Sequence, residues 1–513
     1  MDNTMNPLIL GAADSISGDF EKSDYAALSG QAKIDALLGS AVARLFAFLE
    51  IPLGRANDLV TDFISFGPPV TGDYVFFDAS RKAGSLGLTG VRIHTIDLGG
   101  ASVGASLHQA TAIIRRDPGA VVLVAGADIP RSAHTPLELM RHTNRAAAHP
   151  EHEFPCGASL IGLYALMARR FMHESGVTRE DLRAVTRYYR ERAAGVPRAV
   201  NRGKALGDED FNLVIADPYC PAMSAVVTDH GFATLVMDEA RYERLSSLGL
   251  IRADLPRVFV AGSGLALHSE FCVYKGELSS AAGMAAREAF ADAGAVPGEV
   301  EYAWIYDCFT HMLPMQAARY FGIGSYEAAS SLSRGCIDSG TRSVPVNGCG
   351  GLLNYRAAMM ISGATGLVDV LSRYGLCATL QRPDGPAPPL SLMGGNGGID
   401  SVNSVVLFSM TPRHGGDRDP FPRRKDVFLN RVGCDEGEEG TVFASTSVNF
   451  NPDGPVQPPY VLALVRFERD RVVMANLCDA SGGVLVSDPD VAFDRTSVVM
   501  RRDGPRWKAC VRS

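Results

Sequence analysis

The sequence describes a mildly acidic chain of 513 residues, with a formal net charge of -8 and a pI near 5.8. This length exceeds what one hydrophobic core usually holds, so we expect two or three domains. Hydrophobic residues make up 46% of the chain and charged residues 21%, which is ordinary for a globular protein. The acidic balance argues against a general nucleic-acid binder, but it allows an anionic ligand held by a local group of amides or basic side chains.

The N-terminal segment and the cysteines favour a cytoplasmic protein. The segment MDNTMNPLILGAADSISGDF carries acids and no basic region before its short apolar run, so it does not resemble a signal peptide. No uninterrupted run of about 18 apolar residues occurs, so we expect no membrane span. The 10 cysteines include no CxxC pair, which favours reduced, mostly buried thiols and no metal site.

In chain order, the first predicted element is a buried strand, PLILGAAD, which begins at Pro7. An alanine-rich helical stretch, IDALLGSAVARLFAFL, follows it. A glycine-rich turn then begins the amphipathic helix of LGGASVGASLHQATAIIRR, which leads into the strand AVVLVAGAD. We expect a loop insertion over about residues 130–220 and the end of this first half at about residue 250.

The second half repeats this order from residue 251 to 412. A buried strand, RVFVAGSGLAL, begins at Arg257 and is followed by the helical stretch SSAAGMAAREAFADAG. Another glycine-rich turn then leads into a helix, within GCGGLLNYRAAMMISGATGLVDVLSRYG. The shared order predicts two α/β units of similar plan.

The rest of the chain changes character. Residues 413–426 are rich in proline, glycine and charge and are predicted to be a linker. Residues 427–513 consist of short alternating runs, and Asp503 and Gly504 supply hairpin-turn chemistry, so we expect a small all-β domain. Its basic end contains one tryptophan and follows an acidic stretch, which argues against a nucleic-acid partner.

Five sequence blocks carry a family resemblance. They read VVLVAGAD, PYCPAMSAVVTDHGFATLVMDEA, WIYDCFTHMLPMQAARYFG, VNGCGGLLN and SLMGGNGGIDSVNSVVLF, in the order and spacing of thiolases. The chain from Pro7 to about Met410 therefore resembles the thiolase superfamily, and in particular its sterol-carrier-protein type. The C-terminal region resembles the additional domain of bacterial thiolase-like proteins called acetyl-CoA acetyltransferases. The resemblance implies an α/β body with five αβαβα layers built from two similar halves, plus a small OB-like β domain.

The same resemblance implies four catalytic positions, and this chain differs at all of them. A thiolase places a nucleophilic cysteine at a helix N-terminus, which lowers the thiol pKa, but Gly100 stands there. Tyr306 stands where an Asn or His holds a catalytic water, and Met393 stands in place of the second cysteine. The Gly-His-Pro histidine has no counterpart in the stretch around Asn354. We therefore expect a degenerate site that does not carry out thiolysis.

The remaining candidates lie in these blocks. We take Tyr306, Asp307 and Tyr355 as possible catalytic residues, although an aromatic that merely fills the space of a lost water is an equal interpretation of Tyr306. Ser102 is more typical of a helix cap, and the thiols of Cys308 and Cys349 are more typical of buried structural cysteines. The substrate-binding candidates share these glycine-rich or motif segments: Gly100, Ser102, Cys308, His311, Cys349, Gly350, Gly351, Asn354, Gly395, Asn396 and Gly397.

Three functions remain open at this point. The first is an acyl-CoA-related protein of the acyltransferase superfamily that is not a working thiolase. The second is a retro-aldolase that cleaves a β-hydroxyacyl-CoA with Tyr306, since thiolase-like aldolases also lack the cysteine and rely on tyrosines. The third is a non-catalytic acyl-CoA or lipid carrier, or a partner in a hetero-oligomeric complex. We expect a coenzyme A thioester as ligand, no permanently bound cofactor, and either the homodimer usual for thiolases or a monomer.

Overall fold

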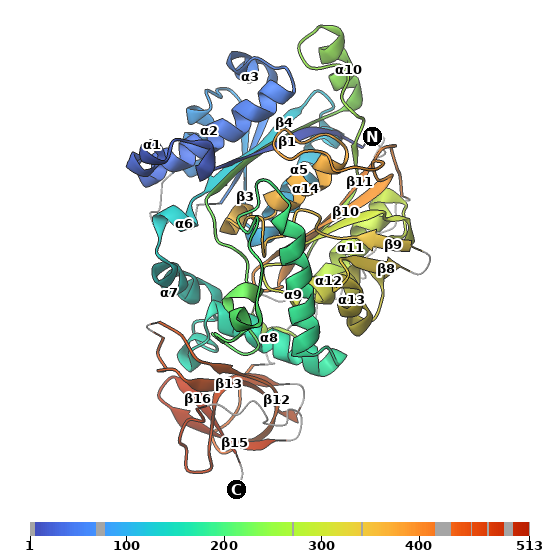
Figure 1. Cartoon of the computed structure of the whole chain (residues 1–513). Coiled ribbons are helices and arrows are strands. Elements are labelled where there is room, and N and C mark those ends of the chain that lie inside the picture. The colour runs from blue at the N-terminus through green and yellow to red at the C-terminus, as the bar shows by residue number, and fades with distance from the viewer. Residues whose placement is uncertain are drawn as a thin grey trace.

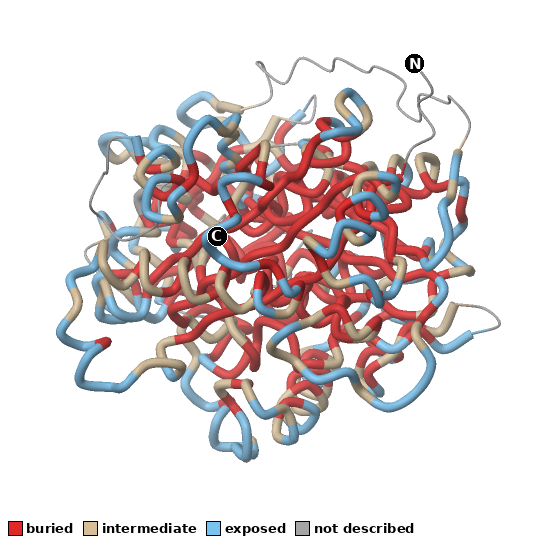
Figure 2. Tube along the Cα trace, turned by 90° about the horizontal axis from the view of Figure 1, so that it is seen from above, coloured by how far each residue is buried: buried red, intermediate tan, exposed pale blue. Residues whose placement is uncertain are grey.

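The computed structural model describes residues 6–67, 77–268, 271–339, 342–415, 432–452, 454–468, 471–486 and 496–511. Figure 1 shows a large α/β body with a small β barrel at one end. The tube in Figure 2 is buried through its centre and exposed mainly at its outer turns. The buried apolar residues form several clusters, one of them within the barrel.

The first half of the body contains five strands in the order β3-β2-β4-β5-β1. β2 runs parallel to β3 and β4, whereas β5 is antiparallel to both β4 and β1. Four of the five strands are buried along their whole length, so they consist of nearly continuous apolar runs. Their bounds are β1 Leu8–Ile16, β2 Asp62–Phe66, β3 Arg92–Ile96, β4 Val121–Asp128 and β5 His230–Met237.

The second half repeats this plan in the order β6-β11-β10-β7. β10 runs parallel to β7 and antiparallel to β11, and β11 is antiparallel to β6. The pair Leu8 and Phe259 joins β1 to β6, so the nine strands form one hydrogen-bonded series. The matching order confirms the two similar halves. The strand bounds are β6 Phe259–Leu267, β7 Tyr302–Ile305, β10 Leu390–Gly397 and β11 Val402–Ser409.

Helices cover both outer faces of the strands and fill the space between the halves. α2 (Gly30–Phe48) lies on the outer face of the first half, and α11 (Ser280–Ala293) with α12 (Met312–Phe321) covers the second. α5 (Ser102–Arg116) and α14 (Ala364–Arg373) contact strands of both halves. This sandwich confirms the five αβαβα layers.

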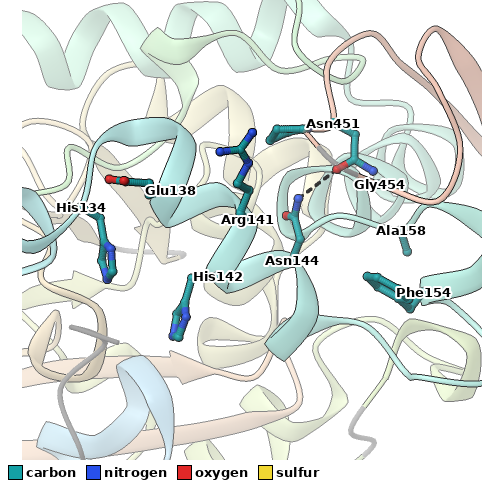
Figure 3. Close-up of a pocket in the computed structure, with 10 residues that line it drawn as sticks. His134, Glu138, Arg141, His142, Asn144, Phe154, Ala158, Asn451 and Gly454 are labelled. Atoms are coloured by element: carbon teal, nitrogen blue, oxygen red, sulfur yellow. Dashed lines mark hydrogen bonds between the residues drawn. The ribbon is translucent and has the colours of Figure 1, made fainter. Parts of the chain in front are cut away.

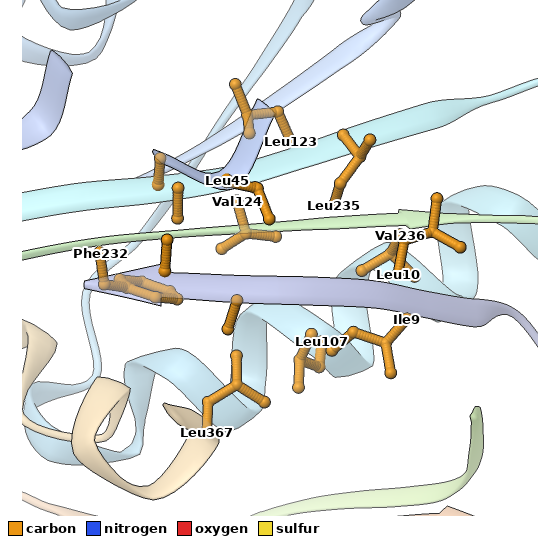
Figure 4. Packing of buried hydrophobic residues seen from close by; sticks show 14 of the residues in the cluster. Ile9, Leu10, Leu45, Leu107, Leu123, Val124, Phe232, Leu235, Val236 and Leu367 are labelled. Atoms are coloured by element: carbon orange, nitrogen blue, oxygen red, sulfur yellow. The ribbon is translucent and has the colours of Figure 1, made fainter. Parts of the chain in front are cut away.

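The core of the first half is formed by long aliphatic side chains from α2, the strands and the two central helices. The Ser29 hydroxyl accepts a hydrogen bond from the amide of Ala32 and so caps α2. Leu45 of α2 packs above the strands, while Leu107 of α5 and Leu367 of α14 pack below them (Figure 4). Full burial of one such leucine contributes about 1.5–3 kcal/mol. Among the described residues no single helix is long and apolar enough to cross a membrane, and the one pair that qualifies by composition, α2 with Leu53–Leu59, is bent by 97°.

The predicted loop insertion over about residues 130–220 contains three helices of two or more turns, while its status as an insertion stays a prediction. The segment contains α7 (Pro136–Ala147), α8 (Leu160–Ser175) and α9 (Arg179–Ala194). Capping boxes begin two of these helices, with Thr135 paired to Glu138 in α7 and an equivalent pair in α9. The apolar side of α8 is buried against the barrel as well as the body, which weakens the two-faced pattern expected of a surface helix.

The C-terminal strands form a closed barrel in the order β12-β13-β14-β16-β15. Gly504 has a φ of 61° in the turn of the last hairpin, as the Asp-Gly pair predicted. The small all-β domain is thus confirmed, while its OB-like character and the domain boundaries stay predictions. Most of the predicted linker, 413–426, lies outside the described residues. The strand bounds are β12 Glu439–Val448, β13 Tyr460–Arg466, β14 Val472–Cys478, β15 Ser497–Asp503 and β16 Arg506–Val511.

α8 lies between the barrel and the body (Figure 1). Phe443 and Leu462 of the barrel share one apolar cluster with Leu163 of α8 and with Phe309 of the body. The Asn476 amide of β14 donates a 2.9 Å hydrogen bond to the carbonyl of Cys156, just ahead of α8. α8 therefore packs against the barrel on one side and against the α/β body on the other.

Candidate functional site

Three chain segments meet at the N-terminus of α5. The first is the turn Gly99–Ala101, which leads from β3 into the helix. The second is the end of β10, where a Cβ atom at Gly397 would lie 2.0 Å from the carbonyl oxygen of Leu98. The third is the segment before α14, where a Cβ atom at Gly363 would lie 3.1 Å from the carbonyl oxygen of Gly100. Backbone meets backbone here, and Gly397 in particular has no room for a side chain.

The side chain of Tyr306 occupies the space above Gly100. A Cβ atom at residue 100 would lie 2.0 Å from the Tyr306 hydroxyl oxygen, 2.1 Å from its Cζ and 2.4 Å from the carbonyl oxygen of Asn396. These separations are far inside van der Waals contact, so no side chain fits at position 100. Tyr306 follows β7 directly and brings its phenol to the N-terminus of α5. The fold thus places a phenol where a residue-100 side chain would project.

Tyr306 belongs to a buried polar group that also contains Tyr164, Cys308 and Asn396. Burial raises the pKa of both phenols well above their ordinary value and raises the pKa of the Cys308 thiol to about 12. These three groups are therefore protonated near neutral pH and can donate hydrogen bonds. The Asn396 amide lies beside the Tyr164 phenol and acts to lower its pKa, yet neither amide atom has a partner in good hydrogen-bond geometry among the described residues. The group is uncharged and lacks a thiolate nucleophile.

His311 lies in an aromatic region next to this group. Its Nδ1 lies within hydrogen-bond distance of the Tyr219 hydroxyl, and the rings of Tyr164 and Phe309 pack beside it with centroids 4.4 Å apart. Burial lowers the pKa of His311 to about 3, so the imidazole is neutral at ordinary pH. Its Nε2 has no partner within the described part of the chain. Among the described residues no three His, Cys, Asp or Glu side chains come together as a possible metal site.

Asp307 points to the glycine turn rather than to Tyr306. Its carboxylate accepts hydrogen bonds from the backbone amides of Leu352, at 2.7 Å, and Leu353, at 3.4 Å. A Cβ atom at Gly351 would lie 2.0 Å from the Asp307 Oδ2, so the carboxylate packs directly on the turn. Burial raises the pKa of Asp307 to about 7, against the effect of these two amides. Asp307 therefore holds the glycine turn in place through these two backbone hydrogen bonds.

Tyr355 is directed toward a second buried polar group. Its hydroxyl donates to Oδ2 of Asp14 at 3.1 Å. Asp14 also pairs with Arg198 at 3.0 Å and with His230 at 3.2 Å. Although burial opposes it, hydrogen bonding from His230 and the charges of both partners hold the pKa of Asp14 well below its usual range. Cys349 packs with Tyr355 in a small cluster of its own, as a buried structural thiol does.

The other predicted residues take structural positions. Ser102 accepts a 2.9 Å hydrogen bond from the amide of Leu98 and so closes the turn before α5. Asn354 donates to the carbonyl of Gly350 at 3.1 Å within the glycine turn. Met393 lies on β10 inside the main apolar core. The structure thus separates two sets: Gly100, Ser102, Tyr306, Cys308, Gly395, Asn396 and Gly397 near the start of α5, and Asp307, Cys349, Gly350, Gly351, Asn354 and Tyr355 around the glycine turn.

Sequence reasoning missed Tyr164 and Tyr219. Tyr219 lies in one of the five quoted blocks, so its motif could have indicated it. Tyr164 offered no such signal, because it lies in the predicted loop insertion and outside the five quoted blocks. It reaches the site only because α8 packs across the body. An insertion helix therefore contributes a polar group to the candidate site.

A separate surface pocket of about 500 Å³ lies between α7 and the loop after β12 (Figure 3). The amide of Asn144 donates a 2.9 Å hydrogen bond to Oδ1 of Asn451 across this seam. None of the predicted site residues is among its described lining residues, which are His134, Glu138, Arg141, His142, Asn144, Phe154, Ala158, Asn451, Pro452 and Gly454. This pocket lies at the contact between α7 and the barrel, and it is separate from the candidate site around Gly100.

Comparisons with known proteins give the class of this chain. Residues 268–410 match the family described as Thiolase C-terminal domain-like. The chain is 27% identical over 283 residues to 17-hydroxy-3-oxo-4-pregnene-20-carboxyl-CoA lyase of Mycobacterium tuberculosis, an alignment that covers 53% of this chain and 71% of the relative. It is 28% identical over 299 residues to an acetyl-CoA acetyltransferase of Methanothermobacter thermautotrophicus, covering 57% and 73%.

A solved structure extends the likeness to the whole chain. The monomeric SCP2-thiolase like protein type 1 of Mycobacterium smegmatis aligns over 99% of both chains, with a TM-score of 0.69 and 16% identity. The fold is therefore the thiolase fold with a C-terminal β domain. Together these comparisons support a thiolase-superfamily protein, as the five blocks predicted.

Proposed function

We propose that this protein binds acyl-CoA thioesters and acts on them without forming an acyl-enzyme. The observation that carries the proposal is the Tyr306 hydroxyl in the space above Gly100, where a thiolase would present its nucleophile. A protonated phenol cannot accept an acyl group by the thiolate route, but it can donate a proton or a hydrogen bond. Both curated relatives are named for CoA compounds, which supports the ligand class.

The reaction that this arrangement supports best is the retro-aldol cleavage of a β-hydroxyacyl-CoA. The bond between the α- and β-carbons breaks, and its electron pair moves to the α-carbon as the thioester enolate. The β-hydroxyl becomes a carbonyl and transfers its proton to the Tyr306 oxygen, while the phenol proton passes to the α-carbon. The proton count is unchanged, so the step suits a site whose groups are uncharged. The lyase among the relatives is consistent with cleavage chemistry.

A second candidate is an acyl-CoA-binding protein without turnover. Its support is that the pKa values of Tyr164, Tyr306 and Cys308 all lie far above neutrality and that of His311 far below it, so none of these groups is an ionised base or nucleophile. Such a site can bind a thioester through neutral hydrogen bonds alone.

Purified protein incubated with β-hydroxyacyl-CoA, β-ketoacyl-CoA plus CoA, and acyl-CoA alone separates these candidates. Mass spectrometry should detect the shortened acyl-CoA and the released carbonyl compound from the first substrate, and no thiolysis of the second. Tyr306→Phe should lower kcat for cleavage by about 100-fold or more. The matched control is Tyr374→Phe, which removes a buried hydroxyl bonded to Ser391 at 2.6 Å and should leave kcat unchanged.

Three results would decide against cleavage by Tyr306. Saturable acyl-CoA binding without any product would favour the binding protein. Cleavage that survives Tyr306→Phe would rule out the phenol as the proton carrier. An acyl group found covalently attached to the intact protein would contradict the proposal altogether.

A further inference from the structure

The buried amide of Asn396 is an unusual feature of this site. Its side chain is 1% exposed, and both Nδ2 and Oδ1 lack a hydrogen-bond partner in the described part of the chain. A buried amide without partners is costly, because the water bonds it loses on folding are not replaced. Native proteins therefore keep few such groups, and those at functional sites often await a ligand. The backbone carbonyl of Asn396 lies beside Gly100, which puts this amide at the head of α5.

Tyr164 lies next to this amide and brings a second donor. The Tyr164 phenol is close enough to Asn396, Cys308 and Tyr306 for each of them to influence its pKa. Its ring packs against Phe309 in a tilted arrangement with centroids 4.4 Å apart, which restricts where the hydroxyl can point. Tyr164 comes from α8, whose other face is held by the barrel. The donors thus converge from three separate parts of the chain.

We propose that Tyr164 and Asn396, beside Tyr306, form a hydrogen-bond pocket for the carbonyl oxygen of an acyl-CoA thioester and stabilise it as an enolate during cleavage. This inference rests on the proposed function and names the residues that would contact the thioester. The donors are neutral, which suits a carbonyl that carries no charge when it binds and gains charge only as the bond breaks. A ligand with a permanent negative charge at this point would instead call for a cationic partner.

Calorimetry with two CoA compounds of equal chain length tests the pocket directly. One is the acyl-CoA thioester, and the other is the S-alkyl-CoA thioether, which lacks the carbonyl. Wild-type protein should bind the thioester at least tenfold more tightly. Tyr164→Phe and Asn396→Leu should reduce this preference toward equality while leaving thioether affinity unchanged, and Tyr374→Phe should preserve it. Tyr164→Phe should also lower kcat by about 100-fold and raise KM by no more than the factor by which thioester affinity falls.

The possible results distinguish failure of the hydrogen-bond pocket from failure of the proposed acyl-CoA function. If neither compound binds, the proposed acyl-CoA function fails. If both bind and the two variants keep the wild-type preference, the pocket is wrong while acyl-CoA binding stands.

A stability measurement without ligand gives an independent readout. Asn396→Leu replaces an unpartnered amide by an apolar side chain of similar size, so it should raise the melting temperature of the ligand-free protein as it removes the thioester preference. A residue with a purely structural role would show the opposite, because its loss destabilises the fold. A lower melting temperature for Asn396→Leu would therefore overturn the claim that this amide is held for a ligand.

Discussion

Replacing Gly100 with alanine tests whether Tyr306 truly takes the place of a side chain at position 100. The new Cβ atom would lie 2.0 Å from the Tyr306 hydroxyl oxygen and 2.4 Å from the Asn396 carbonyl oxygen. Overpacking a well-packed interior costs about 1–3 kcal/mol, and we expect the upper end because one contact is with backbone. At Gly39 in α2 no atom lies within 4 Å of an added Cβ, so Gly39→Ala should instead stabilise the protein by about 0.5–1 kcal/mol.

A double-mutant cycle assigns the cost to Tyr306. Tyr306→Ala removes the two shortest contacts of the added Cβ, with Oη at 2.0 Å and Cζ at 2.1 Å, but leaves the Asn396 carbonyl oxygen at 2.4 Å. Gly100→Ala should therefore cost about 1–2 kcal/mol less in the Tyr306→Ala background. Tyr306→Phe keeps Cζ in place and should give no such relief.

Urea unfolding followed by circular dichroism, supported by melting temperatures, measures the four single variants and the two double variants against wild type. Two results would refute the reasoning. Gly100→Ala could behave like Gly39→Ala, or it could cost the same whether or not Tyr306 is present. Either would mean that the phenol does not fill this space, and the proposed chemistry would lose its geometric basis.

Two further predictions concern buried charge. Burial lowers the pKa of His311 to about 3, whereas an unfolded histidine takes up its proton near pH 6.5, so stability should fall as the pH drops from about 6.5 to 3. His311→Phe should flatten this decline in urea titrations, and an unchanged slope would exclude His311 as its source. Asp14→Asn removes the carboxylate that pairs with His230 and leaves Arg198 paired with Asp19 alone, and it should cost about 3–5 kcal/mol. Asp254→Asn, which breaks an exposed ion pair, should cost less than about 1 kcal/mol. Equal losses of unfolding free energy in the two variants would show that the buried ion pairs of Asp14 stabilise the fold no more than an exposed pair does.

The sequence was most informative where structure is encoded locally. The strand that begins at Leu8, the helical stretch within α2 and the hairpin at Gly504 each followed from an apolar run, an alanine-rich composition or turn chemistry. The same signals failed for α8, because this helix is buried against two neighbours and carries apolar residues on more than one side. Its helical character depends on packing that a local pattern does not record.

The sequence by itself determined the two-halved plan and the absence of a cysteine at position 100. Only the tertiary structure decided what the glycine there means. Tyr306, more than 200 residues further along the chain, folds back over Gly100 and leaves no room for a side chain. Tyr164 and Asn396 reach the same point from an insertion helix and from the second half of the sheet. Contacts of this kind arise when layers pack together, so residue types and spacing can indicate each partner but not their meeting.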